Sequence, residues 1–393
     1  MIGMKRLRML IVVVIVLVTS ACSAAGLPTG GTVIPTAPAP TSITVGTTAP
    51  SVPAATVQPT PAPTPEVAFR AFDTPARYRT SSAEAVDGTT AVGWVQVGVA
   101  DEEPAVWETT TGALRVLDVP AEFVHPSGNT FVRLVGVSGT TAVGTGTLGT
   151  KGQRGQDRAM AWNTETGDLR ILDIPAGFTE AEARAISGTT AVGQVWTADR
   201  EDRRPVAWDT ETGAVRILKV PADYECGWPQ AISGDTVVGI RCYGDTGHPI
   251  AWNPLTAAAR ELDRLPATQD ATPRAVDGTT AVGDCCSGEE GTPRPLIWDT
   301  VTGSVRQLTL PAPFENGRAE GVSGMIVVGS SGSTPLVWDL ETGQVRVLPA
   351  PEGYDQTMTV GGVSGRTIVG SACEPPPSAS DGPRCVAAAW TLP

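Results

Sequence analysis

The stretch Pro205–Leu218, PVAWDTETGAVRIL, decides the fold of this chain. An apolar run ends at Trp208, a polar turn ends at Gly213, and a second apolar run carries Arg216. Two strand-like runs joined by a short loop that contains Gly predict a β-hairpin. Because Trp208 and Arg216 lie at equal depth in the two runs, we expect them to face each other across it.

The same unit returns along the chain with the same offset between Trp and Arg. The other pairs are Trp107 and Arg115, Trp162 and Arg170, Trp252 and Arg260, Trp298 and Arg306, and Trp338 and Arg346. A seventh Trp, Trp390, has no Arg after it, whereas residues 67–78 resemble the second half of a unit and carry Arg70. The first strand of the chain is therefore predicted to complete the last repeat, with Arg70 opposite Trp390.

A Ser-Gly or Asp-Gly turn between two apolar runs separates successive Trp hairpins, and this pattern also predicts a hairpin. These stretches are residues 85–93, 136–144, 185–193, 231–239, 275–283, 321–329 and 362–370. Each repeat therefore has four short strands, and seven such repeats predict an all-β fold, a seven-bladed β-propeller of four-stranded blades. Residues 67–73 would close the ring as the N-terminal strand that completes the last blade.

These repeats resemble the HAF repeats of bacterial surface proteins, in which a Val-Gly strand is followed by a strand ending in Trp and by a Leu-rich strand. The resemblance covers nearly all of residues 67–393. It implies a propeller that lies outside the cytoplasm. It implies no biochemical activity, because that family is defined by the repeat itself.

Residues 1–21 have the pattern of an export signal, with basic residues before the apolar run Leu10–Val18, which is short for a membrane span. The run ends in small residues followed by Cys22. This ending resembles the lipobox of bacterial lipoproteins, although Thr19 is not the usual Leu. We expect Cys22 to be lipidated. The alternative is an ordinary signal peptide cleaved near the same place.

Residues 22–66 begin with the lipidated Cys and continue as a Pro/Thr/Ala-rich segment of low complexity, which cannot bury a core. Its prolines favour extended polyproline II segments, so we expect a disordered tether, with a plain spacer as the alternative. The predicted location is the cell membrane, through a lipid anchor, facing outside the cytoplasm. Residues 67–393 would then form one domain.

The residues that recur in every blade favour a structural role, because an active site needs an asymmetric set. We interpret each Trp as packing between blades. Each Arg would stack on the indole or pair with the polar residue that follows Trp. A ring of seven ligand cages is the functional alternative.

Motifs for catalysis are scarce. Residues 144–149 fit the dinucleotide fingerprint, but no helix signal follows them, so there is no βαβ unit. His125 and His248 do not have metal-ligand spacing, and the Gly-x-Ser-x-Gly elbow is missing. The sequence therefore predicts no catalytic residue, no cofactor and no metal. A solvated surface explains the acidic loops better than Ca²⁺ sites do.

The chain is acidic, with a formal net charge of −13. Removing the signal takes away Lys5, Arg6 and Arg8, which changes the charge from −13 to −16. Such a charge argues against nucleic acid as a general partner. We expect a monomer.

Cysteine usage fits an exported protein, since six Cys remain beyond Cys22. Cys226 and Cys242 flank a predicted hairpin, and Cys373 and Cys385 flank a proline-rich loop of the last blade. The predicted disulfides are Cys226–Cys242 and Cys373–Cys385. For Cys285 and Cys286 a vicinal bridge, free thiols and a bond from Cys286 to a neighbouring blade all stay open.

The turns after the first and third strands are short and uniform, whereas those after the second and fourth strands are long and differ in every blade. Variable loops on a rigid frame are where binding usually resides. We expect a partner to dock on these loops in the third and fourth blades. The candidate residues are Trp196, Arg203, Tyr224, Trp228 and Tyr243. The alternative is that the loops vary because nothing constrains them.

The sequence favours a binding or scaffold module displayed outside the cell. First strands such as AISG bring mostly Ala, Gly, Ile and Val to the axis, where an active site would need acids with Tyr or His. The partner would be an unidentified envelope protein or glycan. The alternative is an extracellular hydrolase or lyase of glycans or peptides, with its pocket on the propeller axis.

Overall fold

The computed structural model describes residues 66–393, except 99–100, 125–129, 149–154, 222–225, 244–245, 267, 269, 288–291, 355–357 and 376–382. The side chains of Tyr243, Thr246, Cys286 and Ser287 are also outside the description. The predicted signal peptide, Cys22 and the tether lie outside the described residues. Their assignment therefore stays a prediction.

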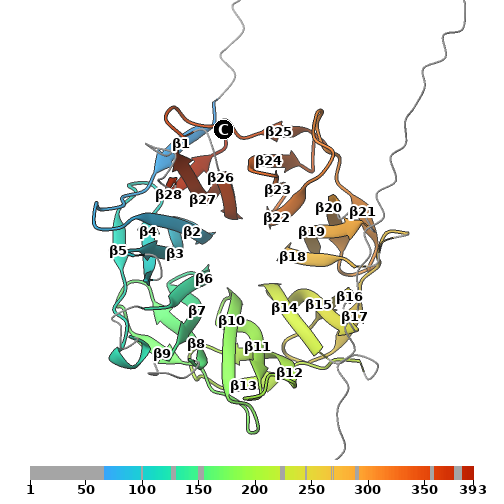
Figure 1. Ribbon diagram of the computed structural model, residues 1–393. Helices are drawn as coiled ribbons and strands as arrows, with labels where there is room; N and C mark the ends of the chain where they lie inside the picture. The colour runs from blue at the N-terminus through green and yellow to red at the C-terminus, as the bar shows by residue number, and fades with distance from the viewer. Residues whose placement is uncertain are drawn as a thin grey trace, which may run out of the picture. The chain divides into compact units, whose positions relative to one another are not determined.

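The described chain forms seven antiparallel sheets of four strands, arranged as a ring (Figure 1). Blade 1 contains β2 to β5, blades 2 to 6 follow in chain order, and blade 7 contains β26, β27, β28 and β1. A single 3-10 turn, η1 (Ala121–Phe123), is the only helical element in the described part of the chain. The predicted all-β propeller with seven four-stranded blades is confirmed.

Each blade runs outward from the centre of the ring. The innermost strands are β2 (Thr80–Asp87), β6 (Val132–Ser138), β10 (Glu180–Ser187), β14 (Cys226–Ser233), β18 (Thr272–Asp277), β22 (Arg318–Ser323) and β26 (Met358–Ser364). The second strands are β3 (Thr90–Gln96), β7 (Thr141–Thr147), β11 (Thr190–Trp196), β15 (Thr236–Tyr243), β19 (Thr280–Ser287), β23 (Ile326–Ser331) and β27 (Thr367–Glu374).

The third and fourth strands form the outer half of each blade. The third strands are β4 (Glu102–Glu108), β8 (Asp157–Asn163), β12 (Arg203–Asp209), β16 (Thr246–Trp252), β20 (Thr292–Asp299), β24 (Thr334–Asp339) and β28 (Arg384–Thr391). The fourth strands are β5 (Leu114–Val116), β9 (Leu169–Ile171), β13 (Val215–Ile217), β17 (Ala259–Glu261), β21 (Val305–Gln307), β25 (Val345–Val347) and β1 (Ala68–Ala71).

The first strand of the chain closes the ring, as predicted, because β1 pairs antiparallel with β28 in blade 7. The predicted register is wrong by one residue. Phe69 lies opposite Trp390, and Arg70 lies opposite Ala389. The ring centroids of Phe69 and Trp390 are 5.4 Å apart. The closing strand therefore packs an aromatic ring, and not a guanidinium, against the last Trp.

The same correction holds in the other blades. Trp208 pairs with Val215, and Arg216 pairs with Ala207. The turn pairs each Trp with the residue seven positions later, so the Arg at the eighth position belongs to the opposite side of the sheet. The prediction that Trp and Arg face each other is wrong because it assumed a turn that is one residue longer.

The Arg side chains join neighbouring blades. Arg115 in blade 1 donates a hydrogen bond through Nη1 to the Thr164 carbonyl of blade 2 at 2.7 Å. Equivalent bonds run from Arg70 to Thr111, from Arg170 to Thr212, from Arg216 to Pro254 and from Arg260 to Thr302. Each acceptor is a carbonyl in the outer turn of the next blade. These five Arg residues therefore join each of their blades to the following blade by a hydrogen bond.

In blade 3 the polar residue after Trp, Asp209, is not hydrogen-bonded to Arg216, which bonds to the next blade. Asp209 instead caps its own turn, because its Oδ1 accepts the backbone N–H of Thr212 at 2.8 Å. Hydrogen bonds from Thr212 and Glu211 lower the pKa of Asp209. In blade 1, hydrogen bonds from Thr110 and Thr111 lower the pKa of Glu108 to about 2.

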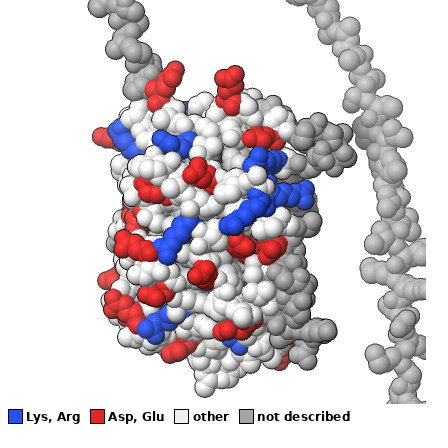
Figure 2. Space-filling model, turned by 90° about the vertical axis from the view of Figure 1, so that its left-hand side faces the viewer, with Lys and Arg blue, Asp and Glu red and all other residues white. Residues whose placement is uncertain are grey.

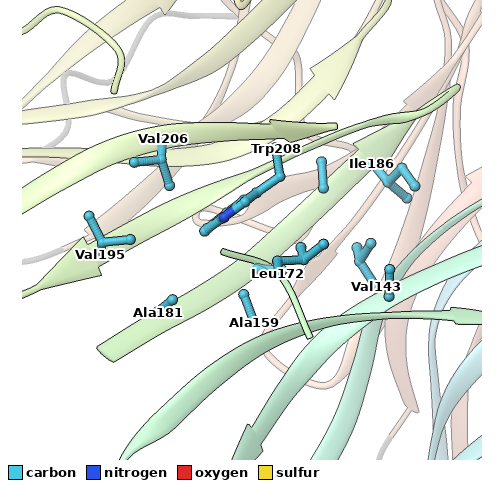
Figure 3. Packing of buried hydrophobic residues seen from close by; sticks show 11 residues of the cluster. Val143, Ala159, Leu172, Ala181, Ile186, Val195, Val206 and Trp208 are labelled. Carbon is cyan, nitrogen blue, oxygen red and sulfur yellow. The ribbon is translucent and has the colours of Figure 1, made fainter. Parts of the chain in front are cut away.

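The seven Trp residues pack between blades, which confirms their structural interpretation. Each of the seven is at most 2% exposed. Figure 3 shows Trp208 of blade 3 beside Leu172, Ala159 and Val143 of blade 2. The indole Nε1 of Trp208 also donates a hydrogen bond to the Asp173 carbonyl of blade 2 at 2.8 Å. Each blade therefore holds the preceding blade through its Trp.

The turns between the first and second strands form a second ring of contacts. In every blade the Gly of the Ser-Gly or Asp-Gly turn donates its backbone N–H to the Ser or Asp side chain of the preceding blade. Gly188 donates to Ser138 Oγ at 3.0 Å. Gly88 donates to Ser364 Oγ at 3.1 Å, which joins blade 1 to blade 7. The Ser-Gly pattern thus makes the turn and also closes the ring.

A Gly of the second strand lies against a β-bulge in the first strand of every blade. In blade 3 the register of β10 shifts between Ala183 and Ala185, opposite Gly193 and Val192. A Cβ at Gly193 would overlap the Glu182 carbonyl oxygen. Only Gly fits at that position, which explains the repeated Val-Gly in physical terms.

Both predicted disulfides, Cys226–Cys242 and Cys373–Cys385, are present. The first joins opposed residues of β14 and β15, and the second joins opposed residues of β27 and β28. Cys285 is buried in the core between blades 4 and 5. Within the described residues no helix has the length and apolar character that a membrane span needs.

We predict that Phe69→Ala lowers the free energy of unfolding by about 2 kcal/mol, because a half-buried ring leaves its contacts with Trp390 and Tyr354. The matched control Arg70→Ala should cost about 0.5 kcal/mol or less, because Arg70 is exposed and holds one long hydrogen bond. Urea denaturation of both variants measures the difference. An Arg70→Ala effect as large as that of Phe69→Ala would contradict this register.

We also expect mass mapping of the non-reduced protein to recover both disulfides. They close loops of 16 and 12 residues, and each should contribute about 3 kcal/mol by restricting the unfolded chain. A reductant should therefore lower the melting temperature. Recovery of the four cysteines as free thiols would argue against the pairing.

Candidate functional site

The two ends of each blade differ in polarity. We call the end with the turns after the first and third strands the short-turn face, and the opposite end the loop face. The buried charged groups lie near the loop face, at the start of first and third strands or the end of second strands. They are Glu102, Glu180, Arg241 and Asp284, each at most 8% exposed. Polar chemistry is therefore concentrated toward the loop face.

Two residues of the predicted binding face lie side by side in blade 3. Trp196 and Arg203 are paired residues of β11 and β12. The guanidinium carbon of Arg203 lies 6.0 Å from the indole centroid, and that of Arg200 lies 5.1 Å from it. Trp196 is only 4% exposed. Its indole therefore braces the loop that connects β11 and β12, and Arg203 offers more surface to a partner.

Arg200 ties that same loop to the neighbouring blade. Its Nη2 lies 2.8 Å from Glu180 Oε2 and 3.3 Å from Asp157 Oδ2, which belongs to blade 2. Burial raises the pKa of Glu180. The hydrogen bonds from Arg200 and from the Asp157 amide lower this pKa by a larger amount in total, so the net shift is downward. The loop between β11 and β12 is therefore anchored by an ion pair between blades.

The rest of the predicted face belongs to blade 4. Trp228 is half-buried on β14, two residues after the disulfide-bonded Cys226. Tyr224 and the side chain of Tyr243 lie outside the described residues. The structure thus brings Trp196 and Arg203 together and places Trp228 on the next blade.

The innermost strands carry more charge than the sequence suggested. The apolar residues before each Ser-Gly or Asp-Gly turn are present as expected, but each β-bulge adds one partly exposed residue to the inner strand. These residues are Glu84, Val135, Arg184, Gln230, Arg274, Glu320 and Gly361. The inner strands therefore carry charged residues in addition to the expected Ala, Gly, Ile and Val. Charged residues just before an inner apolar run were the signal that sequence reasoning missed.

Charged residues of blades 5 and 6 form one cluster around Asp284. Its carboxylate, 3% exposed, accepts a hydrogen bond from Arg274 Nε of the same blade. Arg318 of blade 6 approaches the other carboxylate oxygen, with 3.6 Å between Arg318 Nε and Asp284 Oδ2. Two guanidinium groups therefore share one buried carboxylate.

Glu320 is the fourth charged member of this cluster. Ser330 Oγ lies 3.3 Å from its Oε1. Burial raises the pKa of Glu320, and the positive charges of Arg274 and Arg318 offset only part of that effect. A carboxyl group with a raised pKa holds its proton to a higher pH than an exposed Glu does.

A pocket of about 390 Å³ opens beside this cluster, between blades 6 and 7. Its lining residues are Pro293, Asn316, Gly317, Arg318, Glu320, Ser330, Gly332, Met358, Thr359 and Val360. They come from the inner strands β22 and β26 and from segments that lie toward the loop face. We call this site the Arg318 pocket. It combines a guanidinium, a carboxyl group, hydroxyls and an amide with an apolar wall.

Three other pockets repeat along the Trp seams, in blades 2, 3 and 5. Each lies beside the Trp and Arg of its own blade. The indoles there are 1% exposed, and the Arg side chains of blades 2 and 3 already bond to backbone carbonyls of the next blade. The ligand-cage alternative therefore lacks an exposed aromatic face in these blades.

No group of three or more His, Cys, Asp or Glu residues with metal-binding geometry occurs among the described residues. On the rim that carries β5 and β9, acidic and basic side chains are interspersed (Figure 2).

No family model and no curated protein matches this chain. The propeller domain of the Trilobed protease from Pyrococcus furiosus aligns with a TM-score of 0.50 at 12% identity, over 79% of this chain and 95% of that one. An oligogalacturonate lyase from Vibrio parahaemolyticus has a TM-score of 0.48 at 10% identity, over 84% and 97% of the two chains. A prolyl endopeptidase has a TM-score of 0.48 at 13% identity, over 78% of this chain and 46% of that one.

At these identities the likeness concerns the fold alone. The Pyrococcus furiosus propeller has an open velcro topology. In this chain β1 instead pairs with β28, so the velcro is closed. The two rings therefore share an architecture and differ in how they are closed.

We predict that Glu320→Gln stabilises the protein above neutral pH and has little effect near pH 4. Because the folded-state pKa of Glu320 is raised, the wild-type protein loses stability as pH rises from the unfolded-state pKa through the folded-state value. Thermal melts from pH 4 to pH 8.5 test this. The gap between variant and wild type should widen with pH, and a constant gap would contradict the assigned burial.

Proposed function

We propose that this chain is a membrane-anchored extracytoplasmic β-propeller that acts as a binding or scaffold module, with the loop face as its binding surface. The observation that carries the proposal is the difference between the two faces. Seven turn-to-turn hydrogen bonds occupy the short-turn face, whereas the disulfides, the charged clusters and the Arg318 pocket lie toward the loop face. An envelope protein or glycan is the proposed partner.

The sequence supports the proposed location. Cys22 follows an export signal with a lipobox-like ending, and residues 23–66 suit a tether through the envelope. The two disulfides fit an oxidising compartment. We expect the full chain to fractionate with membranes, and Cys22→Ser to release it into the soluble extract. Equal membrane association of both would argue against the lipid anchor.

The binding role is tested by cross-linking and affinity capture of the full chain from the cell envelope. The double variant Arg203→Ala, Trp228→Ser changes the loop face and leaves the buried Trp196 in place. The matched control Glu165→Ala, Glu211→Ala changes two exposed residues of the short-turn face. We expect the loop-face variant to lose its partners about tenfold or more and the control to keep them, with both melting normally. Equal recovery from both would reject the loop face as the site.

A second candidate is an extracellular hydrolase or lyase of glycans or peptides. The observation that favours it is Glu320, a carboxyl group with a raised pKa in a pocket, as general acids require. Assays with mixed envelope glycans and peptides would detect turnover. If turnover is present, Glu320→Gln should reduce it at least about a hundredfold. Turnover that survives this substitution would exclude Glu320 as the acid.

A further inference from the structure

The Arg318 pocket contains more hydrogen-bond donors than its own acceptors use. Arg318 Nε lies 3.6 Å from Asp284 Oδ2, which is longer than a hydrogen bond. Within the described part of the chain, no oxygen accepts a hydrogen bond from the Arg318 guanidinium. Its side chain is 46% exposed, and it lines the pocket. A planar fork of donors is therefore presented to whatever enters.

The Arg318 fork is held in place from behind. Asp284 is buried, and Arg274 already hydrogen-bonds to it. Asp284 supplies one negative charge to the two guanidinium groups, and Glu320 adds a second negative charge only when it is ionised. Such a fork matches the two oxygens of a carboxylate in a bidentate arrangement.

The buried lining residues that blade 7 contributes to the pocket are apolar. Met358 is 8% exposed, and Val360 is 8% exposed. Pro293 adds apolar surface from blade 5, and Asn316 and Ser330 supply amide and hydroxyl groups. The ten lining residues include no aromatic ring on which a sugar would stack. A carboxylate joined to an apolar side chain fits this combination better than an acidic sugar does.

We propose that the Arg318 pocket binds the C-terminal carboxylate of a peptide whose last side chain is aliphatic. Arg318 receives the carboxylate, Met358, Val360 and Pro293 contact the last side chain, and the polar lining groups bind the peptide backbone. A volume of about 390 Å³ holds two or three residues. The inference rests on the proposed binding role of the loop face and names the chemistry of its partner.

Glu320 sets the pH dependence of this site. It faces Arg274 of β18, Asp284 of β19, Arg318 of β22 and Ser330 of β23. The lining residues from β26 carry no charge. An ionised Glu320 repels an incoming carboxylate, and protonation removes that repulsion. Affinity should therefore rise as pH falls through the raised pKa of Glu320.

The test uses fluorescence anisotropy with the full chain. The probe is a pool of fluorescein-labelled hexapeptides, random at five positions, that end in Val, Leu or Ala with a free carboxylate. The same pool with a C-terminal amide is the paired probe, and labelled oligogalacturonate is the acidic-sugar probe. We expect the amide to bind at least about tenfold more weakly than the free carboxylate, because a charge-assisted pair is lost.

Variants locate the site. Arg318→Ala should weaken carboxylate binding at least about tenfold, and Arg318→Lys should fall between it and the wild type because Lys lacks the planar fork. Glu320→Gln should bind more tightly at pH 8 and lose the pH dependence, which a merely structural residue would not produce. Arg184→Ala, which removes an exposed Arg from the first strand of blade 3, is the charge-matched control and should bind normally. Melting curves check that every variant is folded.

Equal binding of the carboxylate and amide pools overturns the proposal, and so does normal binding by a folded Arg318→Lys variant. Tight oligogalacturonate binding that depends on Arg318, with none of the peptide pool, assigns the pocket to an acidic sugar and overturns the peptide. If envelope partners are captured but none depends on Arg318, this inference fails while the binding role stands. If the pocket binds the carboxylate probe but the loop face captures no envelope partner, the peptide inference stands while the proposed binding role fails.

Discussion

Burial of one indole between each pair of blades is the interaction on which the rest of this structure depends. A four-stranded blade has two faces and cannot cover either of them alone. Each Trp removes on the order of 200 Å² from water, and does so against the blade before it. The seven clusters of buried residues each contain one such Trp. Blade 7 therefore has to meet blade 1, and the closing strand follows from this need.

The architecture could be predicted from the sequence because nearly the same pattern of residues recurs in every blade. The Trp hairpin recurs six times and the Ser-Gly or Asp-Gly turn seven times, and the split last repeat indicates how the ring is closed. The register of Arg216 was missed because one residue of turn length moves a side chain to the other face of a sheet. The charges of Arg274 and Glu320 were missed because the bulge residue, although it lies at the same distance before the turn Gly in every blade, differs in type from blade to blade. Asp284 and Arg318 meet across two blades, and only the folded ring brings them together.

The blades divide their two ends between different kinds of interaction. Toward the short-turn face, backbone N–H groups, hydroxyls and carboxylates bond to one another in a pattern that every blade shares. Toward the loop face, ion pairs such as Arg200 with Glu180 and Arg318 with Asp284 differ from blade to blade. The repeated contacts of the short-turn face can hold the ring closed while the residues of the loop face vary from blade to blade. Asymmetry, which any specific recognition requires, is thus confined to one end of the molecule.

The position of β1 also has a mechanical consequence. As a fourth strand, β1 begins at the short-turn face, where β28 ends. Tension carried by the chain before Glu66 would enter the fold through this four-residue strand on the outer edge of blade 7. If the chain is anchored through its N-terminal segment, the strand that closes the ring would also be the strand that bears the load. The attachment of β1 depends on the contact of Phe69 with Trp390 and on the pairing with β28. Tension on the N-terminal segment and opening of the ring would therefore break the same contacts.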